Sequence, residues 1–115
     1  MKQSKRWAYL GMLAAGLVLA GCGLFNKPPV AVIQAEPTSG PAPLEVAFDG
    51  SSSYDPDGHI TSYLWDFGDQ QTASGVAVSH IYHAPGEFQA TLTVTDNWGA
   101  KGHASVTIQV IESEG

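Results

Sequence analysis

The sequence predicts an all-β protein, a two-sheet sandwich of about seven short strands behind a hydrophobic N-terminal segment. From residue 30 onward several runs alternate apolar and polar residues with a period of two, which is typical of strands with one buried face. No helical apolar period of useful length occurs in this region. Clusters of Gly, Pro, Asn and Asp separate the runs at regular spacing, and this layout favours two packed sheets.

The expected strands follow one another along the chain. They cover residues 30–35, 44–48, 60–67, 76–82, 88–95 and 104–110, and the turns between them lie at 37–43, 55–58, 68–69, 85–86 and 96–99. Tyr63, Trp65 and Phe67 alternate within one run, so their side chains share a face. A domain of this size buries only about 60–65% of its unfolded surface, so its stability depends on its largest residues. Trp65 is the expected centre of the core.

The first 21 residues have the layout of an export signal. Lys2, Lys5 and Arg6 precede an uncharged apolar run at 7–19, which leads into Leu19-Ala20-Gly21-Cys22. Small residues before a cysteine resemble the lipobox of bacterial lipoproteins. The resemblance implies cleavage before Cys22, attachment of diacylglycerol to it, and anchoring to a bacterial membrane, the outer one if the cell has one. The alternative is an uncleaved membrane anchor, because the uncharged stretch 7–26 is about as long as the ~20 residues that a spanning helix needs.

The expected organisation is a signal peptide at 1–21, a lipidated cysteine and short tether at 22–29, a folded domain at 30–111 and a tail at 112–115. Cys22 is the single cysteine of the chain, so the folded domain has no disulfide. Two or more acyl chains anchor a protein stably. The residues between Cys22 and the first strand reach about 25 Å at most, so we expect the domain to work close to its own membrane.

The chain beyond the signal is strongly acidic. Its cations are Lys27 and Lys101, which stand against all eleven Asp and Glu residues and leave a net charge of −9. Binding to nucleic acid depends on Lys and Arg that displace counterions from phosphates. The composition therefore argues against nucleic acid as a partner.

Four motifs in a fixed order give the domain its resemblance to a known family. They are Trp65-Asp66-Phe67-Gly68-Asp69, His80-Ile81-Tyr82, Pro85-Gly86-Glu87-Phe88 and Leu92-Thr93-Val94-Thr95-Asp96. Over residues 29–111 the sequence resembles the PKD domain, which implies an immunoglobulin-like sandwich. It also implies a non-catalytic module that mediates protein or glycan contacts or acts as a spacer. The family usually has Gly where this chain has Gln70, and in a left-handed conformation Gln costs ~1–2 kcal/mol more than Gly.

The motif residues have expected structural roles. Asp66 and Asp69 flank a tight turn, where we expect their carboxylates to accept backbone N–H bonds. The resemblance implies that the ring of His80 is hydrogen-bonded between strands. Tyr82 precedes the turn at Gly86, which suits a tyrosine corner whose hydroxyl bonds to backbone.

The sequence offers little for catalysis and more for a metal ion. It contains no Gly-x-Ser-x-Gly, no His-Glu-x-x-His and no phosphate-binding glycine loop, so we predict no enzymatic activity. Hard cations prefer several oxygen ligands, and residues 49–57 are rich in Asp and Ser. Certain PKD domains of secreted collagenases bind calcium at comparable positions, so the resemblance implies a candidate calcium site at Asp55 and Asp57. The alternative is that Asp-Pro-Asp-Gly is simply a good turn.

Trp98 stands in the expected hairpin tip at 96–99, where the family pattern requires no aromatic residue. It either packs against a neighbouring loop or stays exposed and anchors a ligand, since Trp is enriched at binding hot spots. Two functions remain open. One is a membrane-tethered module that contacts another envelope protein or acts as a spacer, and the other is a carbohydrate-binding module for polysaccharide or peptidoglycan.

Overall fold

The computed structural model describes residues 26–113 of the 115-residue chain. The predicted signal peptide and Cys22 lie outside the described residues. Residues 26–113 contain eight strands and no helix, and hence no helix that could cross a membrane. The strands are β1 (Gln34–Glu36), β2 (Ser39–Pro41), β3 (Leu44–Asp49), β4 (Ile60–Asp66), β5 (Thr72–Ser74), β6 (Ala77–Tyr82), β7 (Gly86–Asp96) and β8 (Lys101–Ile111).

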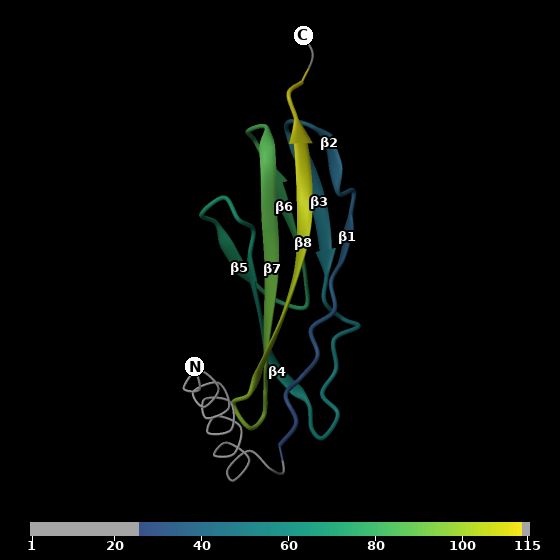
Figure 1. Cartoon of the computed structure of the whole chain (residues 1–115), viewed down its shortest axis with the longest axis vertical. Helices are drawn as coiled ribbons and strands as arrows, with labels where there is room; N and C mark the ends of the chain where they lie inside the picture. The colour runs from purple at the N-terminus through teal and green to yellow at the C-terminus, as the bar shows by residue number, and fades with distance from the viewer. Residues whose placement is uncertain (1–25, 114–115) are drawn as a thin grey trace, which may run out of the picture.

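The strands form two sheets that face each other (Figure 1). A three-stranded sheet has the order β1-β3-β6, and a five-stranded sheet has the order β2-β8-β7-β4-β5. The pairs are antiparallel except for β2, which runs parallel to β8. The prediction of an all-β two-sheet sandwich is confirmed, with eight strands rather than about seven.

The core fills the space between the inward faces of the two sheets. Trp65 is fully buried, its ring lies 5.4 Å from that of Phe48, and its Nε1 donates a 2.8 Å hydrogen bond to the carbonyl of Gly75. The alternating residues of β7 and β8 supply most of the remaining core. The buried apolar side chains are Leu44, Val46, Phe48, Trp65, Phe67, Tyr82, Ala90, Leu92, Val94, Ile108 and Val110. Trp65 is therefore a central core residue, as predicted.

The short edge strands differ from the sequence prediction. The segment 37–43, predicted as a turn, contains β2, and the sequence did not predict β5. Each has three residues, too few to show a period of two, and Pro41 is compatible with an edge strand because an edge leaves one row of backbone groups unpaired. The expected first strand at 30–35 shrinks to β1, and Val30 instead forms an isolated bridge with Tyr54.

The N-terminal residues gather two loops at one end of the sandwich. Lys27 donates its backbone N–H to Oδ2 of Asp57 at 2.7 Å, and Asn97 and His59 exchange two hydrogen bonds of 3.0 Å. In Figure 1 this end is at the bottom, with the tip of the β7–β8 hairpin, while β8 finishes at the opposite end. Residues 26–30, 54–59 and 96–101 are called the N-terminal end of the domain below.

Candidate functional site

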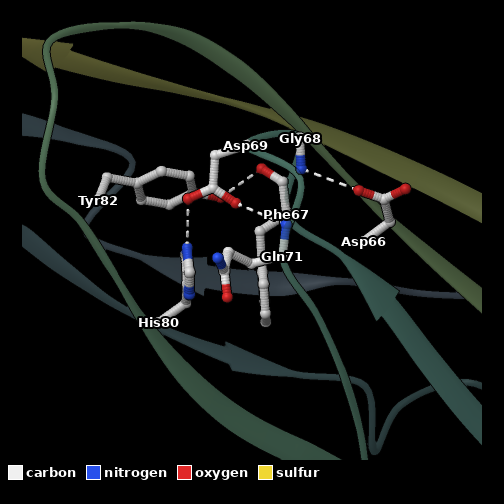
Figure 2. A network of polar contacts seen from close by, with 7 residues as sticks. All are labelled: Asp66, Phe67, Gly68, Asp69, Gln71, His80 and Tyr82. Carbon is white, nitrogen blue, oxygen red and sulfur yellow. Dashed lines mark hydrogen bonds and ion pairs between the residues drawn. The ribbon is translucent and has the colours of Figure 1, made fainter.

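The Trp-Asp-Phe-Gly-Asp motif contains the last two residues of β4 and a tight turn that follows them and lies against Gln89 of β7. Oδ1 of Asp66 accepts the N–H of Gly68 at 3.0 Å, and Oδ1 of Asp69 accepts that of Gln71 at 3.3 Å (Figure 2). Gly68 has φ of 85°, and a Cβ there would approach the carbonyl oxygen of Gln89 to 2.6 Å. Only glycine fits both conditions. Gln70 also has a positive φ, 74°, so this residue carries the free-energy cost of a left-handed conformation.

His80 and Tyr82 connect this turn to β6, and thereby one sheet to the other. Nε2 of His80 lies 2.7 Å from Oδ2 of Asp69, and its ring stacks on Phe67 at 4.1 Å. The Tyr82 hydroxyl donates a 2.8 Å bond to the carbonyl of Phe67, and burial raises the pKa of that hydroxyl. Gly86 begins β7 with φ of 145°. These contacts are structural, because they join the turn after β4 to β6.

A cluster of carboxylates lies at the N-terminal end of the domain. Asp55 and Asp57, the two residues that the sequence offered as calcium ligands, meet Asp96 there, and one oxygen from each lies within 4.8 Å of the others. Asp57 comes from the loop before β4, and Asp96 is the last residue of β7. The three carboxylates form an oxygen-rich cluster of the kind that calcium prefers.

Several side-chain oxygens at the N-terminal end of the domain are buried and have no hydrogen-bond partner. Asp96 is only 2% exposed; its Oδ1 accepts the backbone N–H groups of Trp98 and Ala100, both at 2.8 Å, whereas its Oδ2 accepts none. Both carboxylate oxygens of Asp55 and Oδ1 of Asn26 are equally unpartnered. Buried polar atoms in folded proteins are normally satisfied, and a bound ion can satisfy oxygens that lack a hydrogen-bond donor. The residues present therefore fit a hard cation.

The pKa values of Asp55 and Asp96 are shifted in opposite directions. Burial raises the pKa of the Asp55 carboxyl, and the nearby charge of Asp96 raises it further. Burial is the largest influence on Asp96 and acts in the same direction, but the N–H groups of Ala100, Trp98 and Gly99 and the side chain of Asp55 together outweigh it and hold the pKa of that carboxyl below its usual value. Asp96 is therefore the more strongly ionised carboxyl of the pair. Ionised Asp55 is repelled by the negative charge of Asp96, and a bound cation would relieve this repulsion.

Asp96 belongs to this cluster although the sequence did not predict it as a member. Asp96 lies 39 positions after Asp57, and no local spacing connects them. The register of β4 with β7 does so, since Ile60 stands opposite Asp96. The hydrogen bond from Lys27 to Asp57 places the neighbouring Asn26 beside the same loop. In the sequence, the one indication was that Asp96 is the acidic residue at the end of the motif Leu92-Thr93-Val94-Thr95-Asp96.

Trp98 is the most exposed large hydrophobic residue of the part of the chain that the structure describes, with 69% of its surface accessible. The expectation that it packs against a neighbouring loop is wrong, and the exposed alternative describes its position. The tip has no room for burial because Gly99, with φ of 91°, and the Asp96 carboxylate turn the chain directly back into β8. The backbone of Trp98 is fixed while its side chain faces solvent.

The motif and the fold agree with comparisons to known proteins. The PKD domain model matches residues 26–110, and the chain belongs to the PKD domain family. Collagenase ColA of Clostridium perfringens is 42% identical over 89 residues, which are 77% of this chain and 8% of that protein. The chain thus spans less than a tenth of this relative, in which the PKD domain is a non-catalytic accessory part.

Two solved structures extend this comparison. The crystal structure of the PKD1 domain of Vibrio anguillarum Epp has a TM-score of 0.67 and 36% identity, and the match covers 76% of this chain and 99% of that domain. A structure described as a study of the promiscuous specificity of carbohydrate-binding modules from the β-sandwich superfamily has a TM-score of 0.74 and 35% identity, with 78% of this chain and 37% of that chain covered. The predicted PKD domain is confirmed.

Proposed function

We propose that this chain is an exported, lipid-anchored bacterial envelope protein whose PKD domain makes non-catalytic contacts with another surface protein or acts as a spacer. The observation that carries this proposal is the order of two features. A PKD domain at residues 26–110 begins four residues after Cys22, the cysteine of the lipobox-like segment. No enzymatic role is proposed, because the polar groups of the family motifs hold the two sheets together.

Metabolic labelling with an alkyne fatty acid tests the anchor. The full chain, expressed in a bacterium, is expected to carry the label and to sediment with membranes, and Cys22→Ala is expected to lose the label. A Cys22→Ala protein that stays in the membrane with its first 21 residues attached would favour the uncleaved anchor instead. Crosslinking in intact cells then separates a protein-binding module, which captures a defined partner, from a spacer, which captures none.

We further propose that Asp55, Asp57 and Asp96, together with Asn26, hold a calcium ion. Four unpartnered oxygens on three of these side chains support the assignment, since each is buried without a donor. Bound calcium would supply the positive charge that three adjacent carboxylates lack. Asp96 fixes the hairpin tip through Oδ1 and leaves Oδ2 available, while Asp57 accepts the N–H of Lys27. The site would therefore join three chain segments and stiffen the N-terminal end.

A carbohydrate-binding function is the second candidate, and the likeness to the carbohydrate-binding-module structure supports it. The region best suited to a sugar is a depression of about 590 Å³ beside β6, where Phe88 offers a ring and His80, His83 and Glu45 offer polar groups. Retention of the full chain on insoluble polysaccharide or peptidoglycan, lost in His83→Ala, is the expected result. Passage through every matrix without retention would contradict it.

A further inference from the structure

The two exposed aromatic residues among the described residues both belong to the N-terminal end. They are Trp98, 69% exposed, and Tyr54, 55% exposed, whereas the other exposed large hydrophobic side chains are aliphatic. Tyr54 directly precedes Asp55 of the carboxylate cluster, and Trp98 follows Asp96 by two residues. Trp and Tyr are the residue types enriched where a protein meets the interface between a bilayer and water. This pair therefore suits a lipid surface.

The positive charges of the domain lie at the same end. Lys27 is in the N-terminal segment and Lys101 is the first residue of β8, and both are exposed. No other Lys or Arg occurs in residues 26–113. Acidic residues such as Glu45 and Glu87 lie toward the opposite end, where β3 meets the end of β6 and β7 meets the end of β8. Lysines near a membrane are attracted to its anionic phosphates.

The covalent chain limits how far this end can be from an anchor at Cys22. Three residues separate Cys22 from Asn26, so the two residues are four steps along the chain and at most about 14 Å apart. Residues 27 and 30 are held to the domain by hydrogen bonds with Asp57 and Tyr54, so they add no free length. The polar layer on each side of a bilayer is itself several ångströms thick, roughly 5–7 Å. A lipidated Cys22 would thus bring the N-terminal end to the headgroups.

We propose that the N-terminal end of the domain docks on the bilayer that carries Cys22, with Trp98 and Tyr54 in the headgroup layer and Lys27 and Lys101 against lipid phosphates. This inference rests on the lipid anchor proposed above and names the ligand of Trp98. The geometry of the hairpin tip suits docking, because hydrogen bonds to Asp96 fix its backbone while the indole of Trp98 is exposed to solvent. Docking orients the sandwich so that the end of β8 faces away from the membrane.

The carboxylate cluster gives this docking a dependence on calcium. Three carboxylates outweigh the two lysines at the N-terminal end, so without a cation this end is negative and is repelled by anionic lipid. A bound divalent cation reverses that balance. We therefore expect the domain to dock less on anionic vesicles in chelator than in calcium.

Fluorescence quenching by lipid tests the inference on the processed full chain in vesicles of phosphatidylcholine and phosphatidylglycerol. Trp7 is removed with the signal peptide, and Trp65 is fully buried. The fluorescence of Trp98 is therefore the difference between the wild type and Trp98→Phe. Acyl chains brominated near the headgroup are expected to remove most of this signal in calcium. The double variant Trp98→Phe/Ile111→Trp is the matched control, because it moves an exposed Trp to the end of β8, and its added signal is expected to survive.

Flotation of the same vesicles measures whether the protein is attached to the bilayer, and this separates anchoring through Cys22 from docking of the domain. Protein that floats while Trp98 escapes bromine quenching would overturn the docking and leave the anchor intact. Protein that does not float would overturn the anchor and the docking with it. Protection of Trp98 from an aqueous quencher only after addition of an envelope protein or a polysaccharide would replace the bilayer with that ligand. Equal bromine quenching in calcium and chelator would remove calcium from the docking step.

Discussion

Replacement of Asp55 by Asn is the most informative perturbation of the carboxylate cluster. Asn keeps the shape of the side chain and removes one of the three negative charges. In chelator at neutral pH we expect Asp55→Asn to be more stable than the wild type, because burial and the charge of Asp96 raise the pKa of Asp55 and make its ionised form costly. In calcium we expect the reverse order, because the variant lacks a ligand.

The size of the calcium effect follows from the kind of site. Calcium sites in extracellular modules typically have Kd of about 10⁻⁴–10⁻³ M. At about 10 mM calcium the folded state then gains about 1.4–2.7 kcal/mol by mass action. For a domain of this length that free energy corresponds to a rise in Tm of roughly 6–20 °C. Asp55→Asn is expected to lose most of this rise.

The pH dependence in chelator checks the cause of the crossover. A raised pKa in the folded state means that the folded protein holds the Asp55 proton more tightly than the unfolded chain does. The penalty for ionised Asp55 is therefore complete above its folded pKa, and it disappears as the pH falls through the unfolded value near 3.8. The advantage of Asp55→Asn over the wild type should vanish over the same range.

Thermal unfolding followed by circular dichroism, in calcium and in chelator, gives the required Tm values. Asp49→Asn is the matched control: Asp49 accepts the N–H of Ser51 at 2.8 Å and lies outside the cluster, so its loss should leave the calcium increment unchanged. An equal calcium increment in wild type and Asp55→Asn, or a less stable Asp55→Asn in chelator, would refute the reasoning.

Three further predictions concern the turn, the corner and the metal. Gln70→Gly should raise the free energy of unfolding by about 1 kcal/mol, because Gln70 has φ of 74°; denaturant titration with an unchanged midpoint would contradict this. Tyr82→Phe leaves the buried carbonyl of Phe67 without its donor and should lower the free energy of unfolding by about 1–3 kcal/mol, measured in the same way. Calcium affinity, followed by calorimetric titration, should fall as pH is lowered, because the pKa of Asp55 is raised and its protonation removes a ligand. Affinity that is constant down to pH 4 would argue against Asp55 as a ligand.

The longer strands were predictable because apolar and polar residues alternate along them, as in a sheet with one buried face. β7 and β8 have eleven residues each, enough for the alternation of apolar and polar side chains to be unmistakable. β2 and β5 have three residues each and are held mainly by their neighbours. A segment of that length owes its extended form to pairing, which local sequence does not encode.

The candidate metal cluster was predictable only in part, for a related reason. Asp55 and Asp57 are close in sequence, so their shared loop was visible, while Asp96 arrives through the pairing of β4 with β7. The hydrogen bond of Lys27 with Asp57 brings the adjacent Asn26 to the same loop. The exposure of Trp98 likewise depends on how tightly Asp96 closes the hairpin tip. Each of these features is a consequence of tertiary structure.

The mass of the intact protein, purified from bacterial membranes, tests the central claim most directly. An exported lipoprotein is expected to have the mass of residues 22–115 plus a diacylglycerol group, with or without one further acyl chain, and the modification should be found on Cys22. A membrane-bound protein with the unmodified mass of all 115 residues would contradict lipid anchoring, and with it the placement of Trp98 at the surface of its own membrane.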